Sequence, residues 1–239
     1  PSLYVSSQTS TVIPYQFIEK YLTLSQDIIY LSELPKKMEI KDNATLFIEG
    51  PVSWQDACAF CESKGYSIKT SPTEQLASVL AGVATSCTGE RAFGFGPFRN
   101  HVLELSYFDF NGEFKKLTST KSLEKFPKLS DYQEQYVPYK QFKNAPFPRL
   151  EKETDMLIGT EGQLGIIVNA LIEITPSQNL KYFFIPLPYW VEDTHSHLEI
   201  YSLLQSFRGK IISAEFVDKH SVEFLAEEIR PKHNGDLLF

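Results

Sequence analysis

Three glycines and one carboxylate share seven residues near the middle of the chain. Gly159, Gly162 and Gly165 surround Glu161, and a strand rich in β-branched residues follows from Ile166 to Ile174. Because glycine adopts positive φ and lets a ligand approach the backbone closely, this spacing is typical of a cofactor-binding loop. It is equally typical of a tight turn between two strands. The spacing alone leaves both interpretations open.

Histidines are the usual general bases for removing a hydroxyl proton. His195 and His197 stand two residues apart at the expected start of a helix, where alternate side chains point to different faces. This spacing favours a solvated helix N-terminus capped by Asp193 over a metal site. His220 and His233 have no carboxylate or cysteine at a useful spacing, so we expect them at the surface.

The pair Cys58 and Cys61 has the spacing of a redox motif. Trp54, Ala57 and both cysteines recur every three to four residues along a helix begun by Ser53, so we expect both thiols to face the core. A zinc site would need two more ligands nearby, and none is evident. Trp190 and the phenylalanines are also expected in the core.

Alternating strands and helices are expected to position the glycine loop. We expect strands at residues 3–5, 27–31, 38–40, 44–49 and 166–174, with 38–40 and 44–49 forming a hairpin around Asp42-Asn43. We expect helices at 53–63 and 73–84, the second with Glu74 at its positive end. The proline-rich, polar segment 121–153 is expected to be an irregular insertion or a mobile loop.

The last sixty residues show a different organisation. They predict a strand at 181–186, a helix at 193–207, a strand at 210–217 and a helix at 221–229. This β-α-β-α order suggests half of a ferredoxin-like sheet. Residues 237–239 are expected to enter a third strand.

Composition narrows the function classes. The chain has 239 residues, a formal net charge of −7 and 42% hydrophobic residues, which is typical of a globular protein. No basic stripe is available to neutralise phosphates, which argues against a nucleic-acid partner. No apolar stretch reaches the roughly 20 residues that span a bilayer, and no signal peptide opens the chain. A cytoplasmic protein is the default expectation.

Two ordered segments resemble FAD-linked oxidases of the vanillyl-alcohol oxidase type, which carry a PCMH-type FAD-binding domain. Residues 159–167 resemble the family's G-S-E-G-T-L-G-I-I loop. Pro72, residues 78–89 and residues 95–102 resemble its P…T-I-G-G-x-I-A-T-N-x-x-G…Y-G-x-x-x-D-x-V run, and residues 103–113 are similar to its strand, D-G-E turn and strand.

The resemblance implies an α+β fold with two parts. Residues 1–178 would form the FAD-binding domain, without its usual N-terminal β-α-β stretch, and residues 179–239 the start of a cap domain, so we expect a fragment or a truncated homologue. The implied cofactor is FAD. Its implied binding residues are Ser6, Ser7, Gln8, Thr9, Ser10, Pro72, Ser78, Gly82, Thr85, Gly89, Gly96, Gly159, Glu161, Gly162, Gly165 and Ile166.

Several roles stay open within this resemblance. Glu161 either caps its own glycine turn or contacts the flavin, and His101, aligned near an acidic family position, is either structural or close to the flavin. Arg91 and Arg99 flank the Gly96 turn, where they could pair with phosphate or with an acidic substrate. No catalytic residue is assigned, because the family's histidine-rich motif would come later than Phe239.

The family resemblance implies an FAD-dependent oxidoreductase acting on a small 2-hydroxy acid such as glycolate or D-lactate. Two family loops have changed: Ser6, Ser7 and Gln8 replace three glycines, and Leu80-Ala81 replaces Gly-Gly. The alternative is therefore a degenerate or partial FAD-binding fold that serves as a non-catalytic subunit or interaction module. A partner subunit or a homo-oligomer is implied by relatives that occur in complexes.

Overall fold

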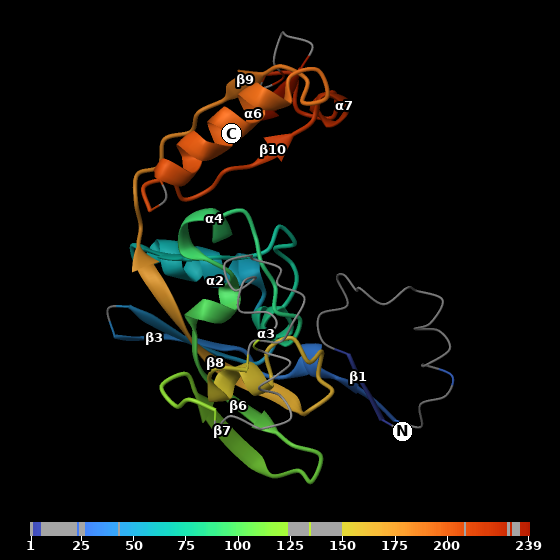
Figure 1. Ribbon diagram of the computed structural model, residues 1–239. Helices are drawn as coiled ribbons and strands as arrows, with labels where there is room; N and C mark the ends of the chain where they lie inside the picture. Colours follow the sequence, from blue (N-terminus) through green and yellow to red (C-terminus); the bar gives the residue numbers. More distant parts are fainter. Residues whose placement is uncertain are drawn as a thin grey trace. The chain divides into compact units, whose positions relative to one another are not determined.

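The computed structural model describes residues 2–5, 23, 27–42, 44–123, 134, 150–207, 209–228, 230 and 235–239. They form an α+β protein, as predicted. The chain divides into two compact units, shown with their elements in Figure 1. The first unit contains residues 1–89 and 97–177, and the second contains residues 90–96 and 178–239.

The first unit is built on an antiparallel sheet with β8 (Ile166–Pro176) at its centre. The strand order is β3-β4-β8-β6-β7, and β5 pairs with the far end of β8. Because β8 begins directly after Gly165 and pairs Ile166 with Phe108, the sheet fixes the point where the glycine loop ends. The other strands are β3 (Lys37–Asp42), β4 (Thr45–Glu49), β5 (Tyr66–Ile68), β6 (Val102–Phe108) and β7 (Phe114–Thr118).

Two predicted hairpins are confirmed. β3 pairs with β4, and Asp42 lies at the turn between them. Its Oδ1 accepts a hydrogen bond from Ala44 N at 3.3 Å. β6 pairs with β7 around a turn in which Asp109 Oδ1 accepts from Asn111 N at 2.9 Å. Aspartate commonly organises turns in this way, by bonding to the backbone two residues on.

Two helices also contribute to the core of this unit. α2 (Trp54–Ser63) begins where predicted, because Ser53 Oγ accepts from Asp56 N at 3.0 Å. Figure 1 shows α2 and α3 (Val79–Ala84) on the same side of the sheet. The shared core contains Leu46, Ile48, Trp54, Ala57, Cys61, Val79, Val83, Ala170 and Ile172.

The predicted helix at 73–84 is wrong in its first half, since α3 begins only at Val79. Residues 75–79 instead bond to the start of α2: Gln55 N donates to Gln75 O at 2.8 Å, and Val79 N donates to Val52 O at 2.9 Å. Hydrogen bonds to this distant segment use the backbone N–H and C=O groups that a longer helix would need. Glu74 therefore lies outside the helix and does not interact with its positive end.

A parallel pair of strands, β1 (Ser2–Val5) and β2 (Asp27–Tyr30), matches two further predictions. A single-turn helix, η1 (Leu31–Glu33), follows β2. The candidate residues Ser6, Ser7, Gln8, Thr9 and Ser10 lie outside the described residues.

The ends of the predicted insertion pair with one another. Ser122 and Lys152 form an antiparallel bridge, and Leu123 N donates to Glu151 O at 3.1 Å. A short helix, η4 (Glu153–Met156), then leads into the glycine loop. Apart from Glu134, residues 124–149 lie outside the described residues.

The second unit contains a three-stranded antiparallel sheet in the order β10-β11-β9. Its elements follow the predicted strand-helix-strand-helix order, but all four are shorter than predicted. The helix α6 (Thr194–Ser206) begins after Asp193 as expected. The remaining elements are α4 (Ala92–Phe95), β9 (Ile185–Leu187), β10 (Phe216–Val217), α7 (Lys219–Val222) and β11 (Asp236–Leu238).

The short elements have local causes. β11 has three residues, so β9 and β10 can pair with it only over that length. α7 begins earlier than predicted, because Asp218 Oδ1 accepts from His220 N and Ser221 N at 2.8 and 3.0 Å. Among the described residues, no helix has the length and apolar character needed to cross a bilayer.

Candidate functional site

The structure brings together two of the predicted cofactor segments, which are about seventy residues apart in sequence. Gly159 N donates to Val83 O at 3.3 Å, and Glu161 N donates to Ala84 O at 2.8 Å. These carbonyls lie at the C-terminal end of α3, where helix carbonyls lack intrahelical partners. The glycine loop therefore caps α3, and residues 78–85 and 159–165 form one local structure.

The loop has the backbone geometry that its glycines predict. Gly159, Gly162 and Gly165 have φ of +83°, +80° and +151°, and Glu161 itself has a φ of +54°. Thr160 N donates to Leu157 O, and Gln163 N donates to Thr160 O. The amides of Gly162 and Leu164 have no acceptor among the described residues. These two N–H groups are available to an oxygen atom of a ligand.

Glu161 does not cap its own turn. Its side chain is exposed, and its carboxylate accepts no hydrogen bond from the residues that the structure describes. The capping interpretation is therefore wrong, and direct contact with a cofactor stays a prediction. Because a carboxylate only accepts hydrogen bonds, it suits a hydroxyl or a ring N–H of a cofactor better than a phosphate.

The candidate glycines differ in what surrounds them. A Cβ added to Gly82 would lie 2.7 Å from the Trp54 ring and 2.9 Å from Cys87 Sγ, and one added to Gly89 would lie 1.8 Å from Ser71 O. A Cβ added to Gly162 would meet nothing within 4 Å. Packing within the protein thus accounts for the absence of a side chain at Gly82 and Gly89. Gly162 alone of these three borders open space.

Two buried hydroxyl groups lie just before and just after α3 in the sequence. Ser78 precedes α3 and is 2% exposed, and neither its Oγ nor Thr88 Oγ1 has a hydrogen-bond partner among the described residues. Buried hydroxyls without partners are costly, and a bound group could satisfy them. Thr85 Oγ1, by contrast, donates to Ala81 O at 3.0 Å.

The other candidate positions have ordinary structural surroundings. Pro72 lies beside Gly89, since a Cβ on Gly89 would approach Pro72 Cα to 3.4 Å. Ile166 opens β8, and a Cβ on Gly165 would lie 2.6 Å from Phe108 O. Gly96 ends α4 with a φ of +82° and belongs to the second unit, as does Arg91, whose guanidinium lies 5.7 Å from the Phe95 ring centre.

Arg99 is committed to a protein carboxylate. Its Nη2 lies 2.8 Å from Asp155 Oδ1, and the two side chains are 12% and 8% exposed. The interpretation of Arg99 as a phosphate ligand is therefore not supported, since its charge is already compensated within the fold. Nothing in the sequence singled out Asp155, because the pair joins residues 56 apart.

His101 lies in a second polar cluster of the first unit, at the end of η2 (Phe98–His101). Its Nδ1 is 3.4 Å from Glu173 Oε2, which also lies 2.7 Å from Lys69 Nζ. Burial would raise the pKa of Glu173, but hydrogen bonds and the charges of Lys69 and His101 outweigh it and lower this pKa. These contacts support the structural interpretation of His101.

The cysteines are structural, as predicted. Cys61 is buried, and none of the three cysteines forms a disulfide. Burial raises the pKa of Cys61 to about 12 and that of Cys87 to about 12. Because the thiolate is the reactive form, neither group is set up for nucleophilic chemistry at neutral pH.

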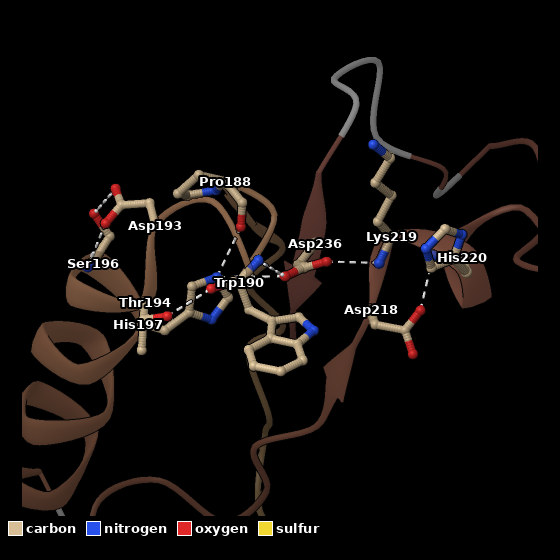
Figure 2. A network of polar contacts seen from close by, with 10 residues as sticks. All are labelled: Pro188, Trp190, Asp193, Thr194, Ser196, His197, Asp218, Lys219, His220 and Asp236. Atoms are coloured by element: carbon tan, nitrogen blue, oxygen red, sulfur yellow. Dashed lines mark hydrogen bonds and ion pairs between the residues drawn. The ribbon is translucent and has the colours of Figure 1, made fainter.

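Figure 2 shows a network around Asp236 in the second unit. Asp236 is fully buried, and its carboxylate accepts from Trp190 N at 2.7 Å and Lys219 N at 2.6 Å. His197 Nε2 lies 3.4 Å from Asp236 Oδ2 and 2.8 Å from Pro188 O. Because both neighbours are acceptors, Nε2 carries a proton. This carboxylate ties the start of α6 and the start of α7 to β11.

The prediction of a solvated helix start is thus wrong for His197, whose side chain is 15% exposed. The prediction holds for His195, which is exposed and whose Nε2 lies 3.2 Å from Glu199 Oε1. Asp193 Oδ1 caps α6, as predicted, by accepting from Ser196 N at 3.1 Å. His220 is exposed, as predicted, and His233 lies outside the described residues. No group of three histidine, cysteine or acidic side chains among the described residues could hold a metal ion.

Aromatic residues depart from the expected core placement. Trp54 is fully buried, but Trp190 is 48% exposed, because its backbone N–H rather than its ring is used by Asp236. Several phenylalanines are also exposed. In the first unit these are Phe108, Phe110 and Phe114, and in the second Phe183, Phe184, Phe207, Phe216, Phe224 and Phe239.

Comparisons with known proteins agree with this fold. No family model matches the chain. Two solved structures of alkyldihydroxyacetonephosphate synthase, in its P212121 and P1 crystal forms, match it with TM-scores of 0.66 and 0.63 at 13% identity. They cover 99% and 93% of this chain, which spans 41% and 36% of theirs. The fold is therefore of the PCMH type found in FAD-linked oxidases.

One curated relative is similar in sequence. D-lactate dehydrogenase of Anaerostipes hadrus is 27% identical over 199 residues, which are 80% of this chain and 36% of that protein. The chain thus spans less than half the length of the relatives it matches. The chain is thus similar in sequence to this dehydrogenase and in fold to the synthase.

Proposed function

We propose that this chain contributes the FAD-binding part of an FAD-dependent oxidoreductase. The observation that carries the proposal is the junction of α3 with the Gly159 loop. There two segments that resemble flavin-binding motifs are hydrogen-bonded to each other, and they offer unused donors.

Each group at this junction would have a defined task. The N–H groups of Gly162 and Leu164 would donate to an oxygen of the cofactor, because fixed backbone dipoles bind oxyanions and carbonyls without a cation. The Ser78 hydroxyl would gain the partner it lacks in the protein. Glu161 would accept from a hydroxyl or ring N–H. When bound, the flavin supplies the hydride-accepting chemistry, and the protein supplies binding and orientation.

For the substrate we propose a small 2-hydroxy acid such as D-lactate or glycolate. The support is the similarity to a protein named D-lactate dehydrogenase. A general base must remove the hydroxyl proton as the hydride leaves the adjacent carbon. The described histidines at 101 and 197 face protein carboxylates, so neither is assigned to this step.

Titration of the chain with FAD tests the cofactor proposal. We expect quenching of flavin fluorescence and a shifted visible absorption band as the isoalloxazine ring leaves water. Riboflavin, which lacks the phosphates, should bind more weakly if backbone N–H groups hold a phosphate. A chain that produces no spectral change at any FAD concentration would contradict the proposal.

A matched pair of variants locates the site. Gly162→Ala and Gly65→Ala each place a Cβ in open space at a φ near +80°, so both should lose about 1 kcal/mol of stability. Only Gly162→Ala should also weaken FAD binding, by about tenfold, because it misaligns one hydrogen bond to a charged group. Equal FAD affinities for the two variants would show that the Gly159 loop is not the site.

A non-catalytic interaction module is the second candidate. Two observations support it: residues 6–8 are not the glycines of the family motif, and the second unit has exposed aromatic side chains. Large exposed apolar patches mark interaction surfaces. Failure to bind FAD, together with self-association or capture of a partner subunit, would favour this function.

A further inference from the structure

A buried ion pair lies just before the Gly159 loop. Arg99 Nη2 is 2.8 Å from Asp155 Oδ1, and Asp155 Oδ2 accepts from the N–H groups of Glu151 and Lys152 at 3.0 Å each. Both carboxylate oxygens are therefore engaged. Buried pairs with this degree of hydrogen bonding hold one geometry, because any displacement leaves a charge uncompensated in a low dielectric.

The Asp155 side of the pair is coupled to the loop through consecutive short turns. Leu157 N and Ile158 N both donate to Thr154 O, and Thr160 N donates to Leu157 O at 3.3 Å. Leu157 and Ile158 are buried. A shift of Asp155 would thus move the backbone that enters Gly159, and with it the bonds from the loop to α3.

The Arg99 side of the pair is anchored in the core. The preceding residue, Phe98, is fully buried and meets the Trp54 ring edge-on with centroids 4.8 Å apart. Trp54 in turn contacts the site of Gly82 in α3. The guanidinium is therefore held relative to the same core that supports the other predicted cofactor segment.

We infer that Arg99 and Asp155 are positioning residues, which hold the Gly159 loop in the conformation that presents the Gly162 and Leu164 amides. The inference rests on the proposed function for the identity of the ligand. In this proposal the pair does not contact the ligand. It determines where the two donors point relative to Ser78 and the end of α3.

The decisive variant is Asp155→Asn, which keeps the side-chain shape and removes the charge. We expect its dissociation constant for FAD to rise about tenfold at a temperature where circular dichroism shows the chain folded. We also expect about tenfold faster hydrogen exchange at the amides of residues 159–165, with β4 unchanged. A purely structural role would not change the FAD affinity of folded molecules, since the competent fraction would stay near one.

Lys69→Met is the matched control. It removes a half-buried ion pair to Glu173 in the same unit, away from the residues that enter the loop. We expect it to leave FAD affinity and loop exchange unchanged. If it changes them as much as Asp155→Asn does, the effect is general destabilisation and the inference is overturned.

The remaining outcomes are also decisive. If the unaltered chain binds FAD and Asp155→Asn binds it equally well, the inference is wrong while the proposed function stands. If the unaltered chain does not bind FAD, the proposed function fails, and hydrogen exchange in Asp155→Asn then tests the positioning role by itself. Faster exchange confined to residues 159–165 supports that role. Unchanged or uniformly faster exchange overturns it. Arg99→Lys repeats both measurements if Asp155→Asn does not fold. Unfolding of both variants would overturn a positioning role.

Discussion

The two segments of the candidate site differ in what surrounds Gly82 and Gly89 on one side and Gly162 on the other. In residues 78–89, Gly82 and Gly89 have no side chain because Trp54, Cys87 and the Ser71 carbonyl fill the space. In residues 159–165, Gly162 has positive φ and borders open space. Glycines that match the same family motif can therefore be required for different structural reasons. Gly82 and Gly89 are fixed by packing, whereas packing does not exclude a side chain at Gly162.

This difference also explains how the first half tolerates change. The family's Gly-Gly is Leu80-Ala81 here, and Leu80 is buried in the core of the first unit. A segment that packs against its own protein can exchange glycine for an apolar residue without losing the fold. A segment that must present N–H groups to a ligand has no such freedom.

The largest effect that tests this comparison is expected at Gly89. Gly89→Ala would place its Cβ 1.8 Å from the Ser71 carbonyl oxygen, which is backbone and cannot rotate away. We expect a loss of about 3 kcal/mol in the free energy of unfolding, measured by urea denaturation. Gly112→Ala, at a φ of +75° in open space, should lose only about 1 kcal/mol. Similar losses for the two would refute the division into packed and open glycines.

A smaller effect, of opposite sign, is expected at Ser78. Ser78→Ala removes a buried hydroxyl without a partner, so the free chain should gain about 1 kcal/mol of stability. FAD affinity should fall, because the cofactor loses a donor. Ser53→Ala is the control, since it removes the hydroxyl that caps α2 and should cost about 1 kcal/mol. A stability loss at Ser78 as large as that at Ser53 would mean that its hydroxyl has a partner in the fold.

The smallest effect is expected at Glu173, which lies on β8 away from the loop. Its pKa is lowered from 4.5, so its stabilisation is present above that value and is lost as the pH falls through the lowered pKa. Its side chain is 37% exposed, so solvent screening limits the loss in Glu173→Gln to about 0.5 kcal/mol at neutral pH.

Urea denaturation of Glu173→Gln across the acidic range provides the measurement. The difference from the unaltered chain should vanish in acid, and FAD affinity should stay unchanged throughout. A difference that grows in acid would contradict the lowered pKa. A fall in FAD affinity would show that the cluster of Lys69, His101 and Glu173 belongs to the site.

Much of the first unit is predictable from local signals. Ser53 marks the start of α2, the apolar run of residues 46–48 predicts β4, and Asp109 with Gly112 marks the β6–β7 turn. Each rests on hydrogen bonds or side-chain periods within a few residues. Asp193 marks the start of α6 for the same reason.

The incorrect predictions concern residues whose placement depends on a partner that is distant in sequence. The helix expected from Thr73 is shortened because residues 75–79 bond to the start of α2. His197 is drawn inward by Asp236, which is 39 residues later in the chain, and Trp190 stays exposed because only its backbone is bound there. Arg99 meets Asp155 rather than a phosphate. No local pattern encodes such partners.

The sequence by itself determined the α+β fold, the capped helices and hairpins, and the position of a glycine loop before a buried strand. It could do so because caps, turns and strand alternation depend on near neighbours. Only the tertiary structure decided which glycines border open space, which amides lack acceptors and which charges are already paired. Those properties depend on packing between segments far apart in the chain, and they separate Gly162, as a candidate ligand contact, from Gly82 and Gly89 in the core.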